Sequence, residues 1–242
     1  MSMLHDKKKT IAEQILQFNY NLSHESFDLP DGIKVINPFK DDPKELVSKV
    51  TTAFYQKYYD NTCTRRLILG SSPARRGSAV TGVPFADAKH LYSETGICID
   101  KFHINQTSSE FMDEVIREYG GYKKFYTDFY MNFVFPLGLV RTNSKGNEIN
   151  CNYYENKKLQ DSLYSFILSS IRSQIDFGID TSVCYCIGSG KNFNYLTKIN
   201  DAHKLFNTII PLEHPRFITQ YNSKRKDMFV KKYIEALCKK KI

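Results

Sequence analysis

Apolar residues recur along the chain in two patterns, one typical of amphipathic helices and one typical of buried strands. Apolar positions spaced three to four residues apart predict helices, and short unbroken apolar runs that stop at glycine or proline predict strands. We expect helices at residues 10–22, 42–61, 108–121, 161–177, 190–199 and 224–241. We expect strands at residues 65–70, 182–188 and 207–212, and another at the start of the apolar run 128–140, which passes into a loop where Pro136-Leu137-Gly138 breaks it. We expect polar loops at residues 28–43, 71–87 and 142–150.

Helix signals support several of these boundaries. Asp42 followed by Pro43 is typical of a helix start, because aspartate caps free amides and proline suits the first helical position. Ser108 or Ser109 caps the helix expected at residues 108–121, and Gly178 ends the helix expected at residues 161–177. The elements therefore alternate between strand and helix along the chain.

This alternation predicts an α/β fold with a central, mostly parallel four-stranded sheet between two layers of helices. No internal repeat or flexible linker divides the chain, so we expect a single domain over residues 1–242, with residues 1–9 a flexible N-terminus. Ligands of such sheets bind at the carboxyl ends of the strands. Three expected strands end there in unusual polar segments, which begin at Gly70, Gly188 and His214.

Composition narrows the class of protein. The chain has 242 residues, 41% of them hydrophobic, which suits a well-buried core. We expect no membrane association, because no apolar run reaches 18 residues, and a cytoplasmic location, because the N-terminus lacks the apolar middle of a secretory signal. The six cysteines are scattered without a CxxC pair, so we expect no metal and no cofactor.

The charge indicates a polyanionic partner. A net charge of +8 and a pI near 9.0 favour nucleic acid or nucleotides. Gly188-Ser189-Gly190-Lys191-Asn192 superficially resembles a phosphate-binding loop, but Tyr185 stands where that motif needs glycine and Asn192 where it needs serine or threonine. We therefore interpret the segment as a strand-to-helix turn at which Lys191 and nearby amides contact a DNA phosphate.

The loop over residues 70–85, GSSPARRGSAVTGVPF, carries the most chemistry. Its small residues and prolines let backbone amides approach a ligand closely. Arg75 and Arg76 suit phosphate contacts, and Phe85 offers a stacking face. Composition alone would also fit an arginine-bearing surface loop with Phe85 as its core anchor. A lone histidine such as His214 is more often structural than catalytic, although its place at a strand end favours a functional role.

The loop resembles the first motif of the uracil-DNA glycosylase superfamily, in its single-strand-selective monofunctional branch. That branch carries Gly-x-Asn-Pro-Gly and then Thr-Gly-Val-Pro-Phe at similar spacing. The segment LEHPR at residues 212–216 resembles the second motif, and Asn132 with Pro136-Leu137-Gly138 resembles the segment between the motifs. The run HPRFITQYNSKRK resembles a mainly bacterial second subgroup, which implies a location on the bacterial nucleoid. The resemblance spans roughly residues 67–233 and implies a parallel four-stranded sheet flanked by helices.

The resemblance implies a role for each matched residue. Phe85 would stack on a flipped base, Ser71 would offer its amide to a base carbonyl, and His214 would donate to the oxygen that gains negative charge. Ser72 and His214 are thus the expected catalytic residues, and the expected base-binding residues are Gly70, Ser71, Ala74, Phe85 and Asn132. The expected DNA-binding residues are Arg75, Arg76, Lys191, Arg216, Phe217, Gln220, Lys224 and Arg225, of which Arg216, Phe217 and Gln220 would wedge into the duplex from a loop.

Three positions depart from the family pattern. Ser72 replaces the usual water-positioning asparagine, and Ala74 is small where a larger ring would crowd the base. Asn132 is offset by one residue from the usual Asn-to-Pro spacing, which leaves Phe133 at the matched position. The sequence predicts a monomeric, monofunctional glycosylase that removes a deaminated base from DNA. Uracil is the leading base, with a xanthine or hypoxanthine glycosylase and a non-catalytic DNA-binding module as alternatives.

Overall fold

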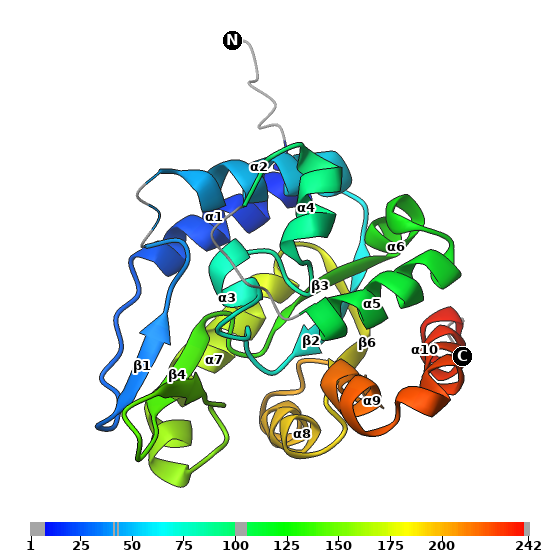
Figure 1. Cartoon of the computed structure of the whole chain (residues 1–242). Coiled ribbons are helices and arrows are strands. Elements are labelled where there is room, and N and C mark those ends of the chain that lie inside the picture. The colour runs from blue at the N-terminus through cyan, green and yellow to red at the C-terminus, as the bar shows by residue number, and fades with distance from the viewer. Residues whose placement is uncertain (1–7, 41, 43, 100–105, 240–242) are drawn as a thin grey trace.

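A computed structural model describes residues 8–40, 42, 44–99 and 106–239, with four parallel strands at the centre (Figure 1). These strands lie in the order β3-β2-β6-β7 and span Arg65–Gly70 (β2), Phe129–Phe133 (β3), Ile179–Ile187 (β6) and Thr208–Leu212 (β7). Gly70 pairs with Phe133, and Ile187 pairs with Leu212, so the carboxyl ends of the strands lie at one edge. The predicted α/β class and parallel sheet are confirmed.

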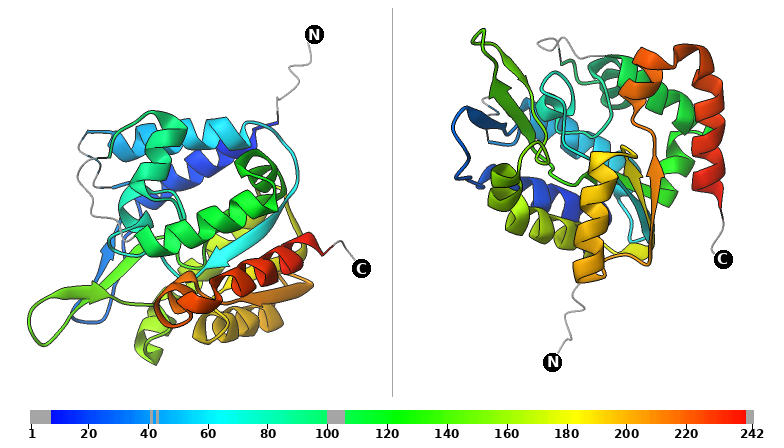
Figure 2. Two further views of the ribbon diagram at one scale, coloured as in Figure 1. Left: turned by 45° about the vertical axis from the view of Figure 1, so that its right-hand side comes forward. Right: turned by 90° about the horizontal axis from the view of Figure 1, so that it is seen from below.

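Helices cover both faces of this sheet. Neighbouring strand residues point to opposite faces: Tyr130 packs against Phe177 next to α7, whereas Phe129 packs against Tyr119 of α5. Figures 1 and 2 show α1, α7 and α8 on one side and α5 and α10 on the other. Their bounds are Ile11–Ser23 (α1), Gln106–Tyr119 (α5), Lys157–Ile175 (α7), Lys191–His203 (α8) and Lys226–Cys238 (α10).

The remaining helices connect these layers. They are α2 (Leu46–Tyr59), α3 (Ser78–Thr81), α4 (Ala88–Thr95), α6 (Tyr122–Asp128), α9 (Pro215–Tyr221) and the 3₁₀ turn η1 (Ser223–Arg225). Asp42 accepts hydrogen bonds from the Val47 and Ser48 amides, as expected of a helix start, although α2 itself begins at Leu46. Pro43 and residues 1–7, for which we expected a helix start and a flexible terminus, lie outside the described residues.

A second, antiparallel sheet stands apart from the central one, in the order β1-β4-β5 (Figure 2). Its strands are β1 (Ile33–Ile36), β4 (Gly138–Thr142) and β5 (Glu148–Asn150). Residues 28–43 and 142–150 were expected to be loops, which is wrong for the parts that form these strands. The strands are short, and β1 pairs with a partner about a hundred residues away, as in Ile33 with Arg141. Local sequence pattern carries little information about such a pairing.

Three further expectations need correction. The expected loop at residues 71–87 contains α3, and α4 and α6 were not expected. Helix α7 begins at Lys157 rather than at residue 161, because the Asn156 side chain accepts from the Leu159 amide and caps it. The segment after His214 is the helix α9 rather than a loop, with Pro215 at its first position.

Strand β2 begins with a buried charge. Arg65 is 1% exposed, and its guanidinium donates to the carbonyl oxygens of Tyr126, Cys63 and Tyr58. It also lies over the ring of Tyr59, 4.8 Å from the ring centroid. A buried charge is tolerated when hydrogen bonds satisfy it. Arg65 therefore fixes the start of β2, whose other end leads into the loop described next.

Candidate active site

A cavity of about 410 Å³ opens at the carboxyl edge of the central sheet. The loop after β2, the end of β3, the segment after β5, the start of α5 and the helix α9 contribute its walls. The wall residues on which the chemistry depends are Ser71, Ser72, Ala74, Arg76, Phe85, Phe133, Asn150, Asn152, Tyr154, His214, Arg216, Phe217 and Gln220. The two motifs singled out in the sequence therefore meet at one cavity.

Two stacked rings form one wall. The rings of Phe85 and Phe133 lie 5.0 Å apart between centroids at an interplanar angle of 25°. Gly70 lies directly behind them, because a Cβ at this position would lie 2.7 Å from Phe85 Cζ and 2.8 Å from Phe133 Cδ1. Phe85 adopts φ of 58°, which is uncommon for an aromatic residue, and its amide donates to Ser78 Oγ at 3.0 Å. Such backbone strain is typical of functional positions.

The two serines after Gly70 are held by a residue from the other side of the cavity. The hydroxyls of Ser71 and Ser72 donate to Asn152 Oδ1 at 3.3 and 3.4 Å. The Arg75 amide likewise donates to Asn150 Oδ1 at 2.8 Å. The end of β5 and the segment after it therefore fix the loop after β2, a contribution that no sequence motif predicted.

His214 faces the cavity as a neutral imidazole. Burial, with a smaller effect from the positive Arg216, lowers the pKa of His214 to about 4. The Arg216 amide donates to Nδ1 at 3.1 Å, so in the neutral ring the hydrogen resides on Nε2. His214 is also the residue that caps α9, and Pro215 begins that helix. The arrangement presents one N–H donor that stays uncharged at neutral pH.

Helix α9 carries the polar and aromatic residues at the cavity mouth. Arg216 Nε donates to Gln220 Oε1 at 3.2 Å, one helical turn away. Phe217 is 47% exposed, and Tyr221, which the sequence analysis did not single out, is 71% exposed. Large exposed rings beside guanidinium groups suit contacts with bases and phosphates.

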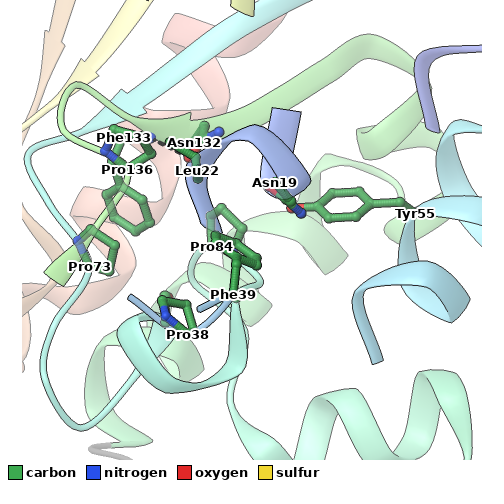
Figure 3. Close-up of a pocket in the computed structure, with 12 residues that line it drawn as sticks. Asn19, Leu22, Pro38, Phe39, Tyr55, Pro73, Pro84, Asn132, Phe133 and Pro136 are labelled. Carbon is green, nitrogen blue, oxygen red and sulfur yellow. Dashed lines mark hydrogen bonds between the residues drawn. The ribbon is translucent and has the colours of Figure 1, made fainter. Parts of the chain in front are cut away.

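Asn132 lies away from this cavity. It lines a separate space of about 10 Å³ that shares Pro73, Ser78 and Phe133 with the large cavity (Figure 3). Its Nδ2 donates to the Tyr130 hydroxyl, and its Oδ1 accepts from the Phe133 amide. The structure thus does not bring Asn132 to the place expected of a base-reading residue, and Phe133 occupies the cavity wall instead.

Four of the expected DNA-binding residues also lie outside the cavity wall. Arg76, Arg216, Phe217 and Gln220 line it, whereas Arg75, Lys191, Lys224 and Arg225 do not. Lys191 is the exposed first residue of α8, and Arg225 donates to Met228 Sδ at 3.6 Å. Contacts of these four residues with DNA stay a prediction.

The sequence contains a pattern that indicates the side of the cavity formed by Asn150, Asn152 and Tyr154. Cys151 and Tyr153 are buried in the core, whereas Asn150, Asn152 and Tyr154 line the cavity. This alternation has the period of two that is typical of an extended strand with one buried face. The predicted polar loop ends at residue 150, and no element was predicted for residues 151–154.

The described residues contain no group of three or more His, Cys, Asp or Glu side chains placed to hold a metal ion. Within the same residues, no helix combines the length and apolar character needed to cross a bilayer.

Most of the chain matches a known family. Residues 56–238 match the model of the uracil DNA glycosylase superfamily. The chain belongs to this superfamily and is a DNA glycosylase, an enzyme that hydrolyses N-glycosidic bonds in DNA. Among solved structures, this chain is similar to "The crystal structure of WT Pedobacter heparinus SMUG2", with 43% sequence identity and a TM-score of 0.88. The match covers 94% of this chain and 96% of that one. No curated protein matches. The resemblance expected from the two motifs is confirmed.

Proposed function

We propose that this DNA glycosylase removes uracil from DNA and leaves an abasic site for base-excision repair. The observation that carries the proposal is a neutral histidine donor that shares a cavity with the Ser71-Ser72 pair and the Phe85–Phe133 stack. The matched SMUG2 protein from Pedobacter heparinus supports the same branch of the superfamily.

Base binding would use the aromatic wall. A base that leaves the duplex loses stacking on its neighbours, at a cost of a few kcal/mol. Phe85, already backed by Phe133, would return part of this stacking energy. The Ser71 amide would donate to a carbonyl of the base, as the family resemblance implies. The cavity volume of about 410 Å³ accommodates a base with part of its sugar.

Bond cleavage would place negative charge on the base. When the N-glycosidic bond breaks, its electron pair goes to the base, and the sugar becomes an oxocarbenium-like cation. His214 Nε2–H would donate to the base oxygen on which the charge gathers, which stabilises the transition state more than the ground state. A water held at Ser72 Oγ would add through its oxygen to C1′, and its proton would be lost to solvent. The products would be the free base and an abasic sugar.

We propose that the enzyme is monofunctional. A glycosylase that also cuts the strand uses an amine to form a Schiff base with the sugar. Among the described residues that line the cavity, none is a lysine. Water is therefore the nucleophile in this proposal.

Xanthine or hypoxanthine is the second candidate for the removed base. Ala74 lines the cavity and is exposed, so the wall leaves space beside the base that a larger side chain would fill. A purine needs more space than uracil. The other alternative drawn from the sequence, a non-catalytic DNA-binding module, is not supported, because the chain is a DNA glycosylase.

We further propose that the enzyme acts as a monomer in the cytoplasm, on DNA of a bacterial nucleoid, and without a cofactor. One chain supplies both Ser72 and His214 to the cavity, so a second copy is not needed to complete the site. The net charge of +8 favours binding to DNA. Sedimentation at micromolar concentration, with and without an oligonucleotide, tests the oligomeric state.

A panel of oligonucleotides tests the base. Single-stranded and mismatched double-stranded oligonucleotides would carry uracil, xanthine or hypoxanthine, and alkaline cleavage would report abasic sites under single-turnover conditions. We expect uracil to be removed fastest. His214→Ala should lower the rate about 10²–10³-fold, as the loss of one donor to a developing anion does elsewhere. Faster removal of xanthine would move the assignment to the second candidate, and no removal of any base would overturn the proposed function.

A further inference from the structure

The segment after β5 presents a carboxamide to the two serines across the cavity. Asn152 lies between Cys151 and Tyr153, which are 2% and 0% exposed, and itself lines the cavity. The Tyr153 hydroxyl bonds to the buried Asn192, which in turn donates to the Ile187 carbonyl at the end of β6. The Cys151 amide donates to the Leu139 carbonyl of β4 at 2.9 Å, so one buried neighbour is held by each sheet, and together they fix where the Asn152 side chain points.

The turn after Asn152 adds a second restraint. The Asn152 amide donates to Glu155 Oε1 at 3.1 Å, and Glu155 Oε2 pairs with Arg141 Nε of β4 at 3.3 Å. This ion pair is exposed, so it contributes little to overall stability. Its effect is local, because it closes the turn that carries Asn152 against the antiparallel sheet.

The hydrogen bond from Ser72 to Asn152 determines whether the Ser72 hydroxyl can donate to, or only accept from, a water molecule in the cavity. A serine hydroxyl has one hydrogen and two lone pairs. Because Ser72 Oγ donates its hydrogen to Asn152 Oδ1, it can only accept from a water molecule in the cavity. A water that donates to Ser72 Oγ keeps a lone pair free to attack C1′. A freely rotating hydroxyl could instead donate to the water and occupy the lone pair that the reaction needs.

Ser71 strengthens this restraint. It donates to the same Oδ1 at 3.3 Å, so the two serines fill both lone pairs of that oxygen. Among the described residues, nothing accepts a hydrogen bond from Asn152 Nδ2, so the contacts of this side chain converge on the two serines. The carboxamide is thereby committed to orienting the loop after β2.

We propose that Asn152 is a positioning residue that holds the Ser72 hydroxyl as a pure acceptor and so orients the attacking water. This inference rests on the proposed function, since it concerns the same hydrolysis. It assigns Asn152 an effect on the chemical step and none on the affinity for DNA.

A double-mutant cycle tests this coupling, with the single-turnover rate of uracil removal from a single-stranded oligonucleotide as readout. Ser72→Ala and Asn152→Ala should each lower the rate about 10–100-fold, the effect expected when a hydrogen bond that orients a reactant is lost. The double variant should be no slower than the slower single variant, because both changes remove one function. The affinity for an oligonucleotide with an abasic-site analogue should stay within about 2-fold, since that complex contains no attacking water.

Two further variants keep the test interpretable. Asn152→Asp retains an oxygen acceptor at the same place, so Ser72→Ala should lower the rate by the same factor in this background as in the unaltered protein. This arm applies even if Asn152→Ala unfolds, which thermal denaturation would show. Asn147→Ala, in the exposed turn between β4 and β5, is the matched control on the same hairpin, and it should leave the rate unchanged.

The outcomes distinguish a failure of the positioning role of Asn152 from a failure of the proposed function. If Ser72→Ala costs the same factor with and without Asn152, or if it loses its effect in the Asn152→Asp background, the positioning role is wrong while the proposed function stands. If the unaltered protein removes no uracil and no other deaminated base, the proposed function is wrong, and this inference fails with it.

Discussion

At the scale of single residues, the protonation of His214 sets the working range of the site. Burial and the nearby Arg216 lower the pKa of His214 to about 4, so the ring is neutral throughout the physiological range. A neutral ring donates through Nε2 while Nδ1 accepts from the Arg216 amide. Protonation at Nδ1 would remove that acceptor and disturb the start of α9.

The rate of base removal should therefore change little between pH 8 and pH 5, because His214 does not titrate in that interval. A single-turnover rate profile with a uracil oligonucleotide measures this. Stability should behave differently: the unfolded chain takes up a proton at His214 near pH 6.5, and the folded chain does so only near pH 4. Lowering the pH between these values should favour unfolding, by at most about 1.4 kcal/mol per pH unit for this one proton.

The control for this prediction is His214→Gln, which should show a shallower loss of stability between pH 6.5 and pH 4 in urea denaturation. A rate that falls with a midpoint near pH 6.5 in the unaltered protein would mean that His214 titrates normally. That result would contradict its description as a buried neutral donor.

Gly70 is the residue on which the aromatic wall depends. Gly70→Ala would place a Cβ 2.7 Å from Phe85 and 2.8 Å from Phe133, so both rings would have to move. We expect a loss of about 1–3 kcal/mol in the free energy of unfolding, typical of an overpacked core, and weaker binding of base-containing DNA. Urea denaturation and an oligonucleotide titration measure these two effects.

Ser144→Ala is the control, since Ser144 is exposed in the turn between β4 and β5 and its side chain makes no hydrogen bond to the described residues. It should leave the free energy of unfolding within about 0.5 kcal/mol of the unaltered value. Equal effects of the two substitutions would mean that the rings do not need the space at Gly70.

For single residues, the sequence predicted which motif residues line the cavity better than it predicted the contacts between side chains. Ser72, Phe85 and His214 carry motif signals, and the structure brings them to one cavity. Asn132 and Asn152 show the limit of such prediction. The motif spacing was already offset by one residue at Asn132, and a shift of one residue along a strand turns a side chain to the other face.

At the scale of elements, helix α9 connects the proposed histidine donor to the exposed rings at the cavity mouth. His214 caps this helix, and the helix presents the exposed rings of Phe217 and Tyr221 one turn apart. Because a rigid short helix carries both, the rings hold a fixed position relative to the imidazole. This arrangement suits a wedge that fills the gap left by an extruded base.

Phe217→Ala should therefore slow uracil removal from double-stranded DNA more than from single-stranded DNA, by about 10-fold in the ratio of the two rates. The ring offsets the cost of unstacking, which amounts to a few kcal/mol in a duplex and less in a single strand. Single-turnover rates on the two substrates measure the ratio. Met228→Ala, an exposed apolar residue of α10, is the control, and an unchanged ratio in Phe217→Ala would argue against a wedge at this position.

Element prediction failed where pairing is distant or helices are short. Strand β1 gains its hydrogen bonds from β4, more than a hundred residues later, so its own four residues carry little signal. Helix α9 has seven residues, too few for a periodic apolar pattern, although Pro215 is a start signal. The long helices and buried strands were predicted because their patterns repeat over several turns or fill a whole strand.

At the scale of the whole molecule, the sheet order explains why distant motifs cooperate. Strands β2 and β7 are separated by β6, and all three end at the same edge. The loop after β2 and the start of α9 therefore reach the cavity from two sides, and the antiparallel sheet adds Asn152 from a third. The predicted alternation of strands and helices implied a binding site at the carboxyl edge of the central sheet. The side of the cavity that carries Asn152 depends on the antiparallel sheet, which the sequence pattern did not predict.

In the proposed reaction, this cavity releases a base when water adds to the sugar. Incubation of a uracil oligonucleotide with and without borohydride, followed by mass spectrometry of both products, is the decisive measurement. We predict free uracil, an intact strand with an abasic sugar and no protein–DNA adduct under borohydride, with both products lost in His214→Ala at matched times. Retention of the base, or a strand cut without alkali together with a borohydride-trapped protein–DNA adduct, would contradict this mechanism.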